Sequence, residues 1–327
     1  MFITSPKISQ TINKINKMGA QSIPFLFIID FAMESPIVYA ANEIPQNVLF
    51  KTGLHKNYSE LQHTKSKFHF TIFPPKPSEY REAFGKVMDN IKHGNTYLLN
   101  LTFPSGIVTN LNLAEIFYLS KARFKLLYRS DFVVFSPEIF IEIKDSKIFT
   151  YPMKGTIDAD LPGAKEKLLA NVKELAEHNT VVDLLRNDLS IISKNVRVEK
   201  FRYLEKINTG NGNILQSSSK ICGDLPSNYK EKLGDIIFSL LPAGSISGAP
   251  KLKTLEIILE TETYNRGYYS GVFGYFDGIN LDSCVMIRFI ENQNKRLIFK
   301  SGGGITMMSD PDSEYQELIK KIYVPVA

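Results

Sequence analysis

The sequence has few of the residues that mark several large classes of protein. Its 327 residues include no tryptophan, and two cysteines, Cys222 and Cys284, are too few for a disulfide framework and lack the spacing of a zinc site. We expect both to be packing residues. No apolar run is long enough to span a bilayer, and residues 1–20 contain no apolar core of a secretory signal. These absences predict a cytoplasmic protein that has no membrane partner.

An excess of charge of one sign is also missing. The 39 basic and 34 acidic residues leave a net charge of +5, and the basic residues are dispersed rather than clustered beside aromatic side chains. This pattern argues against a nucleic-acid partner and suits a small anionic substrate. Hydrophobic residues make up 43% of the chain and charged residues 22%, as in ordinary globular proteins. The length allows one large domain or two.

The apolar spacing indicates helices and strands that do not alternate regularly. An amphipathic helix is predicted from Ser78 to Gly94, and a last helix from Ser309 or Asp310 to about Tyr323. Strand hairpins interrupted by helices, without βαβ repeats, predict an α+β fold with large antiparallel sheets. Further helices are expected over residues 164–177, 229–241 and 251–262, and strands over residues 68–73, 132–135, 139–143, 147–150, 271–276, 281–290 and 296–300.

Two of the predicted helices each carry a pair of glutamates three residues apart. Glu174 with Glu177, and Glu314 with Glu317, share one helical face within each pair. Four such carboxylates could converge on Mg²⁺, which prefers oxygen ligands. For either pair alone, a solvated helix face is the more common explanation.

Three further segments contain candidate chemistry. The backbone amides of Gly302–Gly304 could cup an anion, although glycine runs more often make a tight turn. Lys154 follows a strand and is flanked by proline and glycine, where a neutral amine would act as nucleophile or base, although an ordinary loop lysine is more common. Glu138 lies between two predicted strands and is either a general acid or an edge charge.

Two other side chains occupy unusual places. Arg288 lies inside the predicted strand over residues 281–290, and a buried arginine there needs a carboxylate from the protein or from a ligand. His178 directly follows Glu177, and we interpret it as a packing or supporting residue because no Ser-His-Asp or Cys-His system stands out.

Taken together and in their order, these motifs resemble those of the chorismate-utilising enzymes: component I of anthranilate synthase and of aminodeoxychorismate synthase, and the isochorismate and salicylate synthases. The resemblance covers residues 78–323 and implies large antiparallel sheets that form a sandwich flanked by helices. It favours a single catalytic domain over residues 1–327 with a shortened N-terminal region, residues 1–75. The matching segments are Tyr97–Leu101, Ser136–Glu138, Pro152–Thr156, Glu177–Leu189, Leu241–Lys251, Arg266–Gly271, Ile287–Arg288, Gly302–Ile305, Ser309–Pro311 and Glu314–Glu317.

The resemblance also implies roles for individual residues. Mg²⁺ would be held mainly by Glu177 and Glu314, with Glu174 and Glu317 acting directly or through water. Glu138 would protonate the departing ring hydroxyl of chorismate. The ring carboxylate would face the metal, and Tyr269, Arg288 and the glycine amides would hold the enolpyruvyl carboxylate. The implied substrate-binding residues are Thr156, Tyr269, Arg288, Gly302, Gly303, Gly304 and Lys321.

Lys154 favours one subfamily. Anthranilate synthases usually have alanine at this position, whereas aminodeoxychorismate synthases of this type have lysine. Isochorismate and salicylate synthases place a water-activating lysine where this chain has Leu98, and leucine cannot activate water. The resemblance therefore implies an aminodeoxychorismate synthase component I, in which Lys154 attacks the ring and ammonia then displaces it. Anthranilate synthase component I and a non-catalytic chorismate-binding subunit are the alternatives.

Two departures from the family pattern affect regulation and partners. Gln216 stands where many relatives have histidine, and an amide can hydrogen-bond substrate but cannot share a proton. The shortened N-terminal region makes feedback regulation by tryptophan doubtful. The sequence contains no glutaminase machinery, so we expect ammonia from a separate glutamine amidotransferase subunit.

Overall fold

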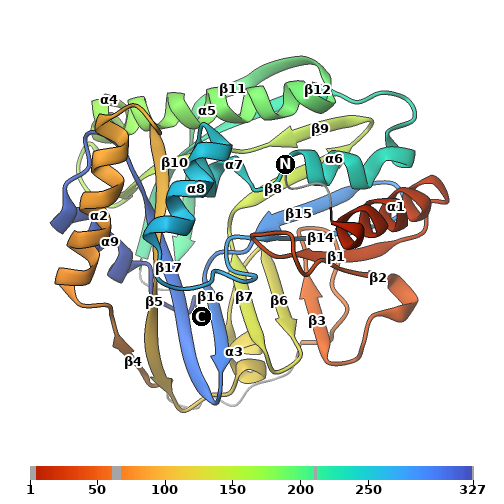
Figure 1. The fold of residues 1–327 in the computed structure, drawn as a ribbon, viewed down its shortest axis with the longest axis horizontal. Helices are drawn as coiled ribbons and strands as arrows, with labels where there is room; N and C mark the ends of the chain where they lie inside the picture. The colour runs from red at the N-terminus through yellow and green to blue at the C-terminus, as the bar shows by residue number, and fades with distance from the viewer. Residues whose placement is uncertain (1–4, 61–67, 210–211, 326–327) are drawn as a thin grey trace. The chain divides into compact units, whose positions relative to one another are not determined.

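The chain forms two compact units that alternate along the sequence. The computed structural model describes residues 5–60, 68–209 and 212–325 (Figure 1). Unit 1 contains residues 1–42, 138–245 and 273–284, and unit 2 contains residues 43–137, 246–272 and 285–327. Each unit is therefore assembled from three separated stretches. The prediction of a single domain is not tested by this division and stays a prediction, and residues 1–4 and 61–67 of its N-terminal region lie outside the described residues.

In the residues that the structure describes, unit 1 contains a large antiparallel sheet of nine strands. Their order is β10-β12-β9-β8-β15-β14-β1-β2, with β11 paired to β12. The strands are β1 (Phe25–Ile29), β2 (Ile37–Ala40), β8 (Ile139–Lys144), β9 (Lys147–Thr150), β10 (Met153–Asp158), β11 (Lys194–Thr209), β12 (Gly212–Asp224), β14 (Val272–Phe276) and β15 (Leu281–Val285). The helices are α1 (Pro6–Ala20), α4 (Ala164–Ala170), α5 (Val172–Ile192), the 3₁₀ turn η2 (Tyr229–Lys232) and α6 (Leu233–Ser239).

Unit 2 contains an eight-stranded antiparallel sheet. Its order is β13-β5-β17-β16-β7-β6-β3, with β4 paired to β5. The strands are β3 (Val48–Lys51), β4 (Phe70–Phe73), β5 (Leu98–Thr109), β6 (Phe124–Tyr128), β7 (Phe132–Ser136), β13 (Gly248–Ala249), β16 (Phe289–Gln293) and β17 (Arg296–Ile305). The helices are α2 (Pro77–Lys92), α3 (Leu113–Leu119), α8 (Lys251–Thr261) and α9 (Pro311–Lys320); η1 (Ala41–Glu43) and α7 (Gly244–Ser247) lie where the chain changes unit.

These elements confirm the predicted α+β class with large antiparallel sheets. Helices α2, α8 and α9 form where the apolar spacing predicts them, although α9 ends at Lys320 rather than near Tyr323. Both cysteines are buried and neither is in a disulfide, as expected of packing residues. In the described part of the chain, no helix is both long and apolar enough to cross a membrane.

The single helix predicted over residues 164–177 is wrong. The structure has α4 and α5 instead, joined at Asn171, which ends the first helix and caps the second. The Asn171 side chain accepts a hydrogen bond from the Glu174 backbone N–H at 3.1 Å, as an N-cap residue does. The backbone of Asn171 is extended, with φ −70° and ψ 110°, so one continuous helix cannot pass through it.

The strand predicted over residues 281–290 is also two elements. Strand β15 ends at Val285 in the sheet of unit 1, and β16 begins at Phe289 in the sheet of unit 2. Arg288 lies between them with φ 54°, a left-handed conformation that interrupts a strand. Arg288 is therefore in a bend and not inside a strand, and it is only partly buried.

A buried charged network supports unit 2. The Arg266 guanidinium donates to both carboxylate oxygens of Glu262, at 2.8 and 2.6 Å, and to the carbonyl of Asn100 at 2.6 Å. Both side chains of the pair are only 2% exposed. Glu262 also accepts from the backbone N–H and the hydroxyl of Thr102. The pair thus satisfies polar groups on the edge of β5 that faces away from β17.

We predict that breaking this buried pair costs far more stability than breaking a surface pair. Glu262→Gln leaves the Arg266 charge buried without its partner and is expected to lower the free energy of unfolding by about 3–5 kcal/mol. Arg81→Met is the control, because Arg81 and its partner Asp312 are 59% and 68% exposed, and is expected to change it by at most about 1 kcal/mol. Chemical denaturation of the variants measures both; equal losses would contradict the prediction.

Candidate functional site

A bulge in β10 determines where Lys154 lies. Met153 pairs with Ser218 and Thr156 with Gln216, so β10 has one more residue than β12 between these two pairs. The extra length falls at Lys154 and Gly155, and Gly155 has a left-handed φ of 81°. Such bulges bend a strand and redirect a side chain. Lys154 thus lies within strand β10 at the bulge, and not in a loop.

The redirected lysine lies beside the carboxylates of α5. Lys154 Nζ is 3.7 Å from Glu177 Oε2, and Lys173 Nζ is 3.9 Å from Glu177 Oε1. The Glu177 side chain is only 10% exposed. A Cβ placed on Gly155 would stand 3.2 Å from Glu174 Oε2. Glu174 and Glu177 therefore both face the bulge, which confirms that the pair shares one helical face and rules out a fully solvated face.

His178 is a buried neutral residue next to this site. It is 0% exposed, and its Nε2 lies 2.6 Å from Ser219 Oγ. Burial, and then the positive charges of Arg202 and Lys154, lower the pKa of His178 to about 4. Its ring also packs edge-on against Phe201. These contacts confirm the interpretation of His178 as a packing and supporting residue.

Gln216 and Thr156 form a polar row on the same sheet. They are direct cross-strand partners in β12 and β10, and Gln216 is also paired with Glu205 in β11. Directly opposed residues in antiparallel strands present their side chains on the same face. Thr156 is exposed and Gln216 partly buried. The amide of Gln216 is thus placed to share a hydrogen-bonded ligand with the hydroxyl of Thr156.

Glu138 lies directly before β8 and is held by a serine from a distant segment. Ser245 Oγ donates to Glu138 Oε1 at 2.5 Å. Glu138 is partly buried. The hydroxyl of Ser245 thus fixes the position of the Glu138 carboxyl group. Ser245 is a functional candidate that the sequence reasoning missed, although it lies inside one of the quoted motifs.

In unit 2, α9 presents the second glutamate pair. Glu314 is 4% exposed, and the Ser309 hydroxyl donates to its Oε1 at 2.8 Å. Glu317 is half exposed and pairs with Lys321 at 2.6 Å. Burial, and then the negative charges of Glu314 and Glu317, raise the pKa of Tyr80.

The three-glycine run is part of strand β17 and not a turn. Gly302 is paired with Thr102 of β5. The Thr102 N–H donates to Glu262 at 2.9 Å and therefore points away from β17. Gly302 and Thr102 are thus a non-hydrogen-bonded pair, in which the N–H and C=O groups of each residue point away from the other strand. Gly302 and, two residues on, Gly304 therefore direct their N–H groups away from β5, whereas Gly303 directs its N–H into the sheet.

The outward edge of β17 next to these glycines has a positive neighbour. Among the described strands, β17 pairs with β16 only as far as Lys300, so Gly302 and Gly304 face no strand on that side. Lys321 Nζ donates to the Gly302 carbonyl at 3.0 Å. The same ammonium is paired with Glu317 at 2.6 Å, and a Cβ placed on Gly303 would stand 3.5 Å from Glu314 Oε2, so the edge has both signs of charge beside it. The Gly303 amide is used within the sheet, and anion binding by the amides of Gly302 and Gly304 stays a prediction.

Tyr269 and Arg288 lie in the same unit. Tyr269 is 3% exposed, and burial raises the pKa of its hydroxyl. The Arg288 guanidinium lies 5.0 Å from the ring centre of Tyr323, and its buried Nε has no hydrogen-bond partner among the described residues. A buried guanidinium N–H without a partner is costly and fits a carboxylate from a ligand.

The predicted residues thus fall into two groups. In unit 1, Lys154 lies near Glu177, and Glu174 faces the same bulge. Thr156 and Gln216 are paired with each other across strands, and Glu138 belongs to the same unit. Unit 2 contains Tyr269, Arg288, Gly302–Gly304, Glu314, Glu317 and Lys321. Convergence of the four carboxylates stays a prediction.

The carboxylate pairs fit the chemistry of magnesium. Within the described residues there is no group of three or more His, Cys, Asp or Glu side chains that could hold a metal ion. Each glutamate pair by itself offers two carboxylates. Mg²⁺ is usually bound through one or two carboxylates together with waters and substrate oxygens, unlike zinc, which takes nitrogen and sulfur ligands. Oxygen donors on two nearly buried glutamates, Glu177 and Glu314, agree with that preference.

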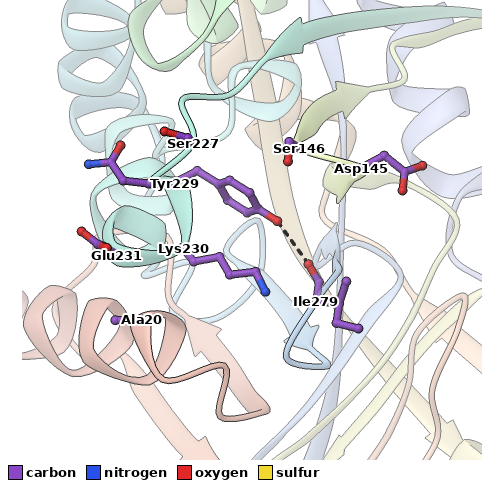
Figure 2. A pocket seen from close by; sticks show the side chains of 9 residues that line it. Ala20, Asp145, Ser146, Ser227, Tyr229, Lys230, Glu231 and Ile279 are labelled. Carbon is purple, nitrogen blue, oxygen red and sulfur yellow. Dashed lines mark hydrogen bonds between the residues drawn. The ribbon is translucent and has the colours of Figure 1, made fainter.

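A separate cavity of about 460 Å³ lies in unit 1 and contains none of the predicted site residues (Figure 2). It is lined by the end of α1, the β8–β9 turn, η2 and the β14–β15 turn. Tyr229 donates to the Ile279 carbonyl at 3.3 Å, and Lys230 to the Gly278 carbonyl at 2.9 Å. These hydrogen bonds join neighbouring loops, so the cavity is a feature of their packing.

Comparison with known proteins identifies the family. The family described as chorismate binding enzyme matches residues 32–327. The chain belongs to this family. A structure titled as a 2,3-dihydroxybenzoate-specific isochorismate synthase from Bacillus anthracis has a TM-score of 0.70 at 20% identity, covering 98% of this chain and 87% of that one. Anthranilate synthase component I of Streptococcus pneumoniae has a TM-score of 0.63 at 27% identity, covering 79% of this chain and 59% of that one. These structures confirm the predicted fold.

Relatives with curated names include members of two subfamilies. This chorismate binding enzyme is 49% identical over 319 residues to an uncharacterized PabA-like protein of Pasteurella multocida, covering 96% of this chain and 98% of that one. Aminodeoxychorismate synthase component 1 of Bacillus subtilis is 32% identical over 260 residues, covering 75% of this chain and 54% of that one. Anthranilate synthase component 1 of Aquifex aeolicus is 34% identical over 195 residues, covering 57% and 38%.

We predict that Gly155 is required for the bulge. Gly155→Ala puts a side chain on a backbone with φ 81°, with its Cβ 3.0 Å from Leu168 Cδ1 and 3.2 Å from Glu174 Oε2, and is expected to cost about 1–3 kcal/mol of stability. Gly85→Ala is the matched control, because a Cβ there meets nothing within 4 Å inside a helix, and is expected to gain about 0.5–1 kcal/mol. Thermal or urea unfolding measures both, and an unaffected Gly155→Ala protein would contradict the account of the bulge.

Proposed function

We propose that this chorismate binding enzyme is an aminodeoxychorismate synthase component I, which converts chorismate and ammonia to 4-amino-4-deoxychorismate. The observation that carries the proposal is Lys154, held by the β10 bulge 3.7 Å from Glu177. A lysine fixed in this way can act as a covalent nucleophile. A site that uses its lysine to activate water, or that has no lysine here, cannot form this covalent bond. The relative of that name in Bacillus subtilis supports the assignment.

The proposed first step is addition of Lys154 to the ring. Once the Lys154 ammonium has given a proton to solvent or to a nearby base, its amine forms a bond to C2, the C1=C2 pair of electrons moves to C1=C6, and the C5=C6 pair moves to C4=C5. The C4–O bond breaks with its electron pair, and Glu138 gives the departing hydroxyl a proton to form water. The proton lost from the attacking nitrogen passes to solvent or to a nearby base. Ser245 holds the Glu138 carboxyl for this transfer.

The second step returns the lysine. Ammonia attacks C4, the double bonds shift back, and the C2–N bond to Lys154 breaks with its electron pair. The nitrogen of Lys154 takes up a proton, and the nitrogen from ammonia loses one. The net reaction consumes chorismate and ammonia and releases the amino product and water. We propose that a separate glutamine amidotransferase supplies the ammonia.

The substrate carboxylates need positive partners. We propose that the enolpyruvyl carboxylate is held by Arg288, whose buried Nε has no partner among the described residues. Tyr269 and the outward N–H groups of Gly302 and Gly304 are proposed to hold it as well. Thr156 and Lys321 are proposed as further substrate contacts.

Magnesium is proposed to be held by Glu177 and Glu314, with Glu174 and Glu317 direct or through water. When bound, Mg²⁺ supplies positive charge that offsets the ring carboxylate.

The product and a lysine variant test the proposal. Purified protein given chorismate, Mg²⁺ and an ammonium salt is expected to accumulate 4-amino-4-deoxychorismate, identified by chromatography and mass spectrometry. Lys154→Ala is expected to lose this product and to shift any remaining turnover toward anthranilate. Lys173→Ala is the matched control, because this lysine also lies near Glu177 but does not take part in the bond changes, and its product is expected to be unchanged.

The rival activity has its own support. Anthranilate synthase component 1 of Aquifex aeolicus shares 34% identity with this chain over 195 residues. Anthranilate as the main product of the unmodified protein would establish that activity and overturn the proposal, and isochorismate as the main product would overturn both. A protein that binds chorismate without any turnover would be the non-catalytic alternative.

A further inference from the structure

Arg202 occupies an irregular point of β11. Between the pairs Lys200–Lys220 and Tyr203–Ser218, β11 has one more residue than β12, and Arg202 has a left-handed φ of 45°. Arginine rarely adopts this conformation, which is a modest cost to the fold. Strain of this kind persists where neighbouring contacts hold it in place. The contacts of Arg202 are therefore informative.

The Arg202 guanidinium closes the end of α4. Its two terminal nitrogens donate to the carbonyls of Leu169 and Leu168, each at 3.0 Å. Carbonyls in the last turn of a helix have no partner within the helix, so these two bonds satisfy groups that would otherwise be unpaired. The planar fork of arginine can reach two adjacent carbonyls at once, which a lysine ammonium does less well.

The backbone of Arg202 reaches α5 through a second route. Its N–H donates to Ser219 Oγ at 2.9 Å, and the same Ser219 oxygen lies 2.6 Å from His178 Nε2. His178 is the residue after Glu177 on α5. One residue of β11 therefore contacts α4 through its side chain and α5 through a serine and a histidine.

Both routes lead to the joint between the two helices. Asn171 ends α4 and caps α5 by accepting from the Glu174 N–H. The side chain of Leu168, whose carbonyl Arg202 holds, also packs against Gly155 in the bulge beside Lys154. The orientation of the first two turns of α5, which carry Glu174 and Glu177, therefore depends on contacts that Arg202 fixes.

We propose that Arg202 is a positioning residue for the magnesium carboxylates of unit 1. By holding the end of α4 and, through Ser219, the side of α5, it sets the direction in which Glu174 and Glu177 face. The inference rests on one part of the proposed function, magnesium binding by Glu177, and not on the identity of the product. Groups that orient metal ligands typically change metal affinity by about 10–100-fold when removed.

Metal affinity measured directly tests the proposal. Mn²⁺, which also prefers carboxylate ligands, is titrated into the full-length protein and its free concentration followed by electron paramagnetic resonance. Arg202→Met is expected to weaken Mn²⁺ binding by about tenfold or more. Turnover with chorismate is expected to recover substantially at saturating Mg²⁺, because the Arg202 guanidinium is bonded to the carbonyls of α4 and is not among the proposed substrate contacts.

Arg197→Met is the matched control. Arg197 lies on the same strand, is 43% exposed, and pairs with Glu199 and Asp224 instead of with the helices. Its replacement is expected to leave Mn²⁺ affinity unchanged within about twofold. All measurements are made at least 10 °C below each variant's unfolding temperature, so that loss of fold is not read as loss of affinity.

A conservative variant keeps the test decisive if Arg202→Met does not fold. Arg202→Lys retains the charge but not the fork, and is expected to bind Mn²⁺ more weakly than the unmodified protein and more tightly than Arg202→Met. Wild-type affinity in a folded Arg202→Met or Arg202→Lys protein would overturn the proposal, as would absence of Mn²⁺ binding by the unmodified protein. The two proposals can fail separately. If the unmodified protein makes anthranilate but Arg202→Met binds Mn²⁺ more weakly, the proposed function is overturned and the role of Arg202 is supported.

Discussion

The bulge in β10 is the constraint on which the chemistry of unit 1 depends. One additional residue in β10, with Gly155 at φ 81°, brings Lys154 to 3.7 Å from Glu177 and leaves room for Glu174 against the strand. Without this additional residue, the side chains of Lys154 and Thr156 would lie on the same face of the sheet, because side chains alternate along a regular strand. The reactive amine and the acidic face of α5 therefore meet because of backbone geometry, which the side chains of the α4–α5 joint then support.

A second constraint of the same kind organises unit 2. The buried Glu262–Arg266 pair captures backbone groups of β5 on the edge that faces away from β17. Because these backbone groups point away from β17, the alternate residues of β5 hydrogen-bond to β17, and the N–H groups of Gly302 and Gly304 point outward beside Lys321. In both units, the pattern of backbone pairing decides which groups are available to an anionic substrate.

Spacing along the sequence predicted the contacts within single helices but not those between distant segments. Glu174 and Glu177 share a face because helical periodicity is local, and the structure confirms it. The break at Asn171 could have been predicted, since asparagine followed three residues later by glutamate is a helix-start pattern. The β17 glycines read as a turn because glycine disfavours strands, and their pairing with β5 is long-range. The contact of Ser245 with Glu138, 107 residues away, has no local signal.

The central claim is that Lys154 forms a covalent bond to the ring of chorismate. Intact-protein mass spectrometry tests it most directly, with chorismate and Mg²⁺ supplied and ammonia withheld. We predict an adduct heavier by chorismate less one water, located at Lys154 by peptide mapping, absent from Lys154→Ala, and discharged when an ammonium salt is added. An unmodified protein that still consumes chorismate once ammonium is present, or an adduct at another residue, would contradict the claim.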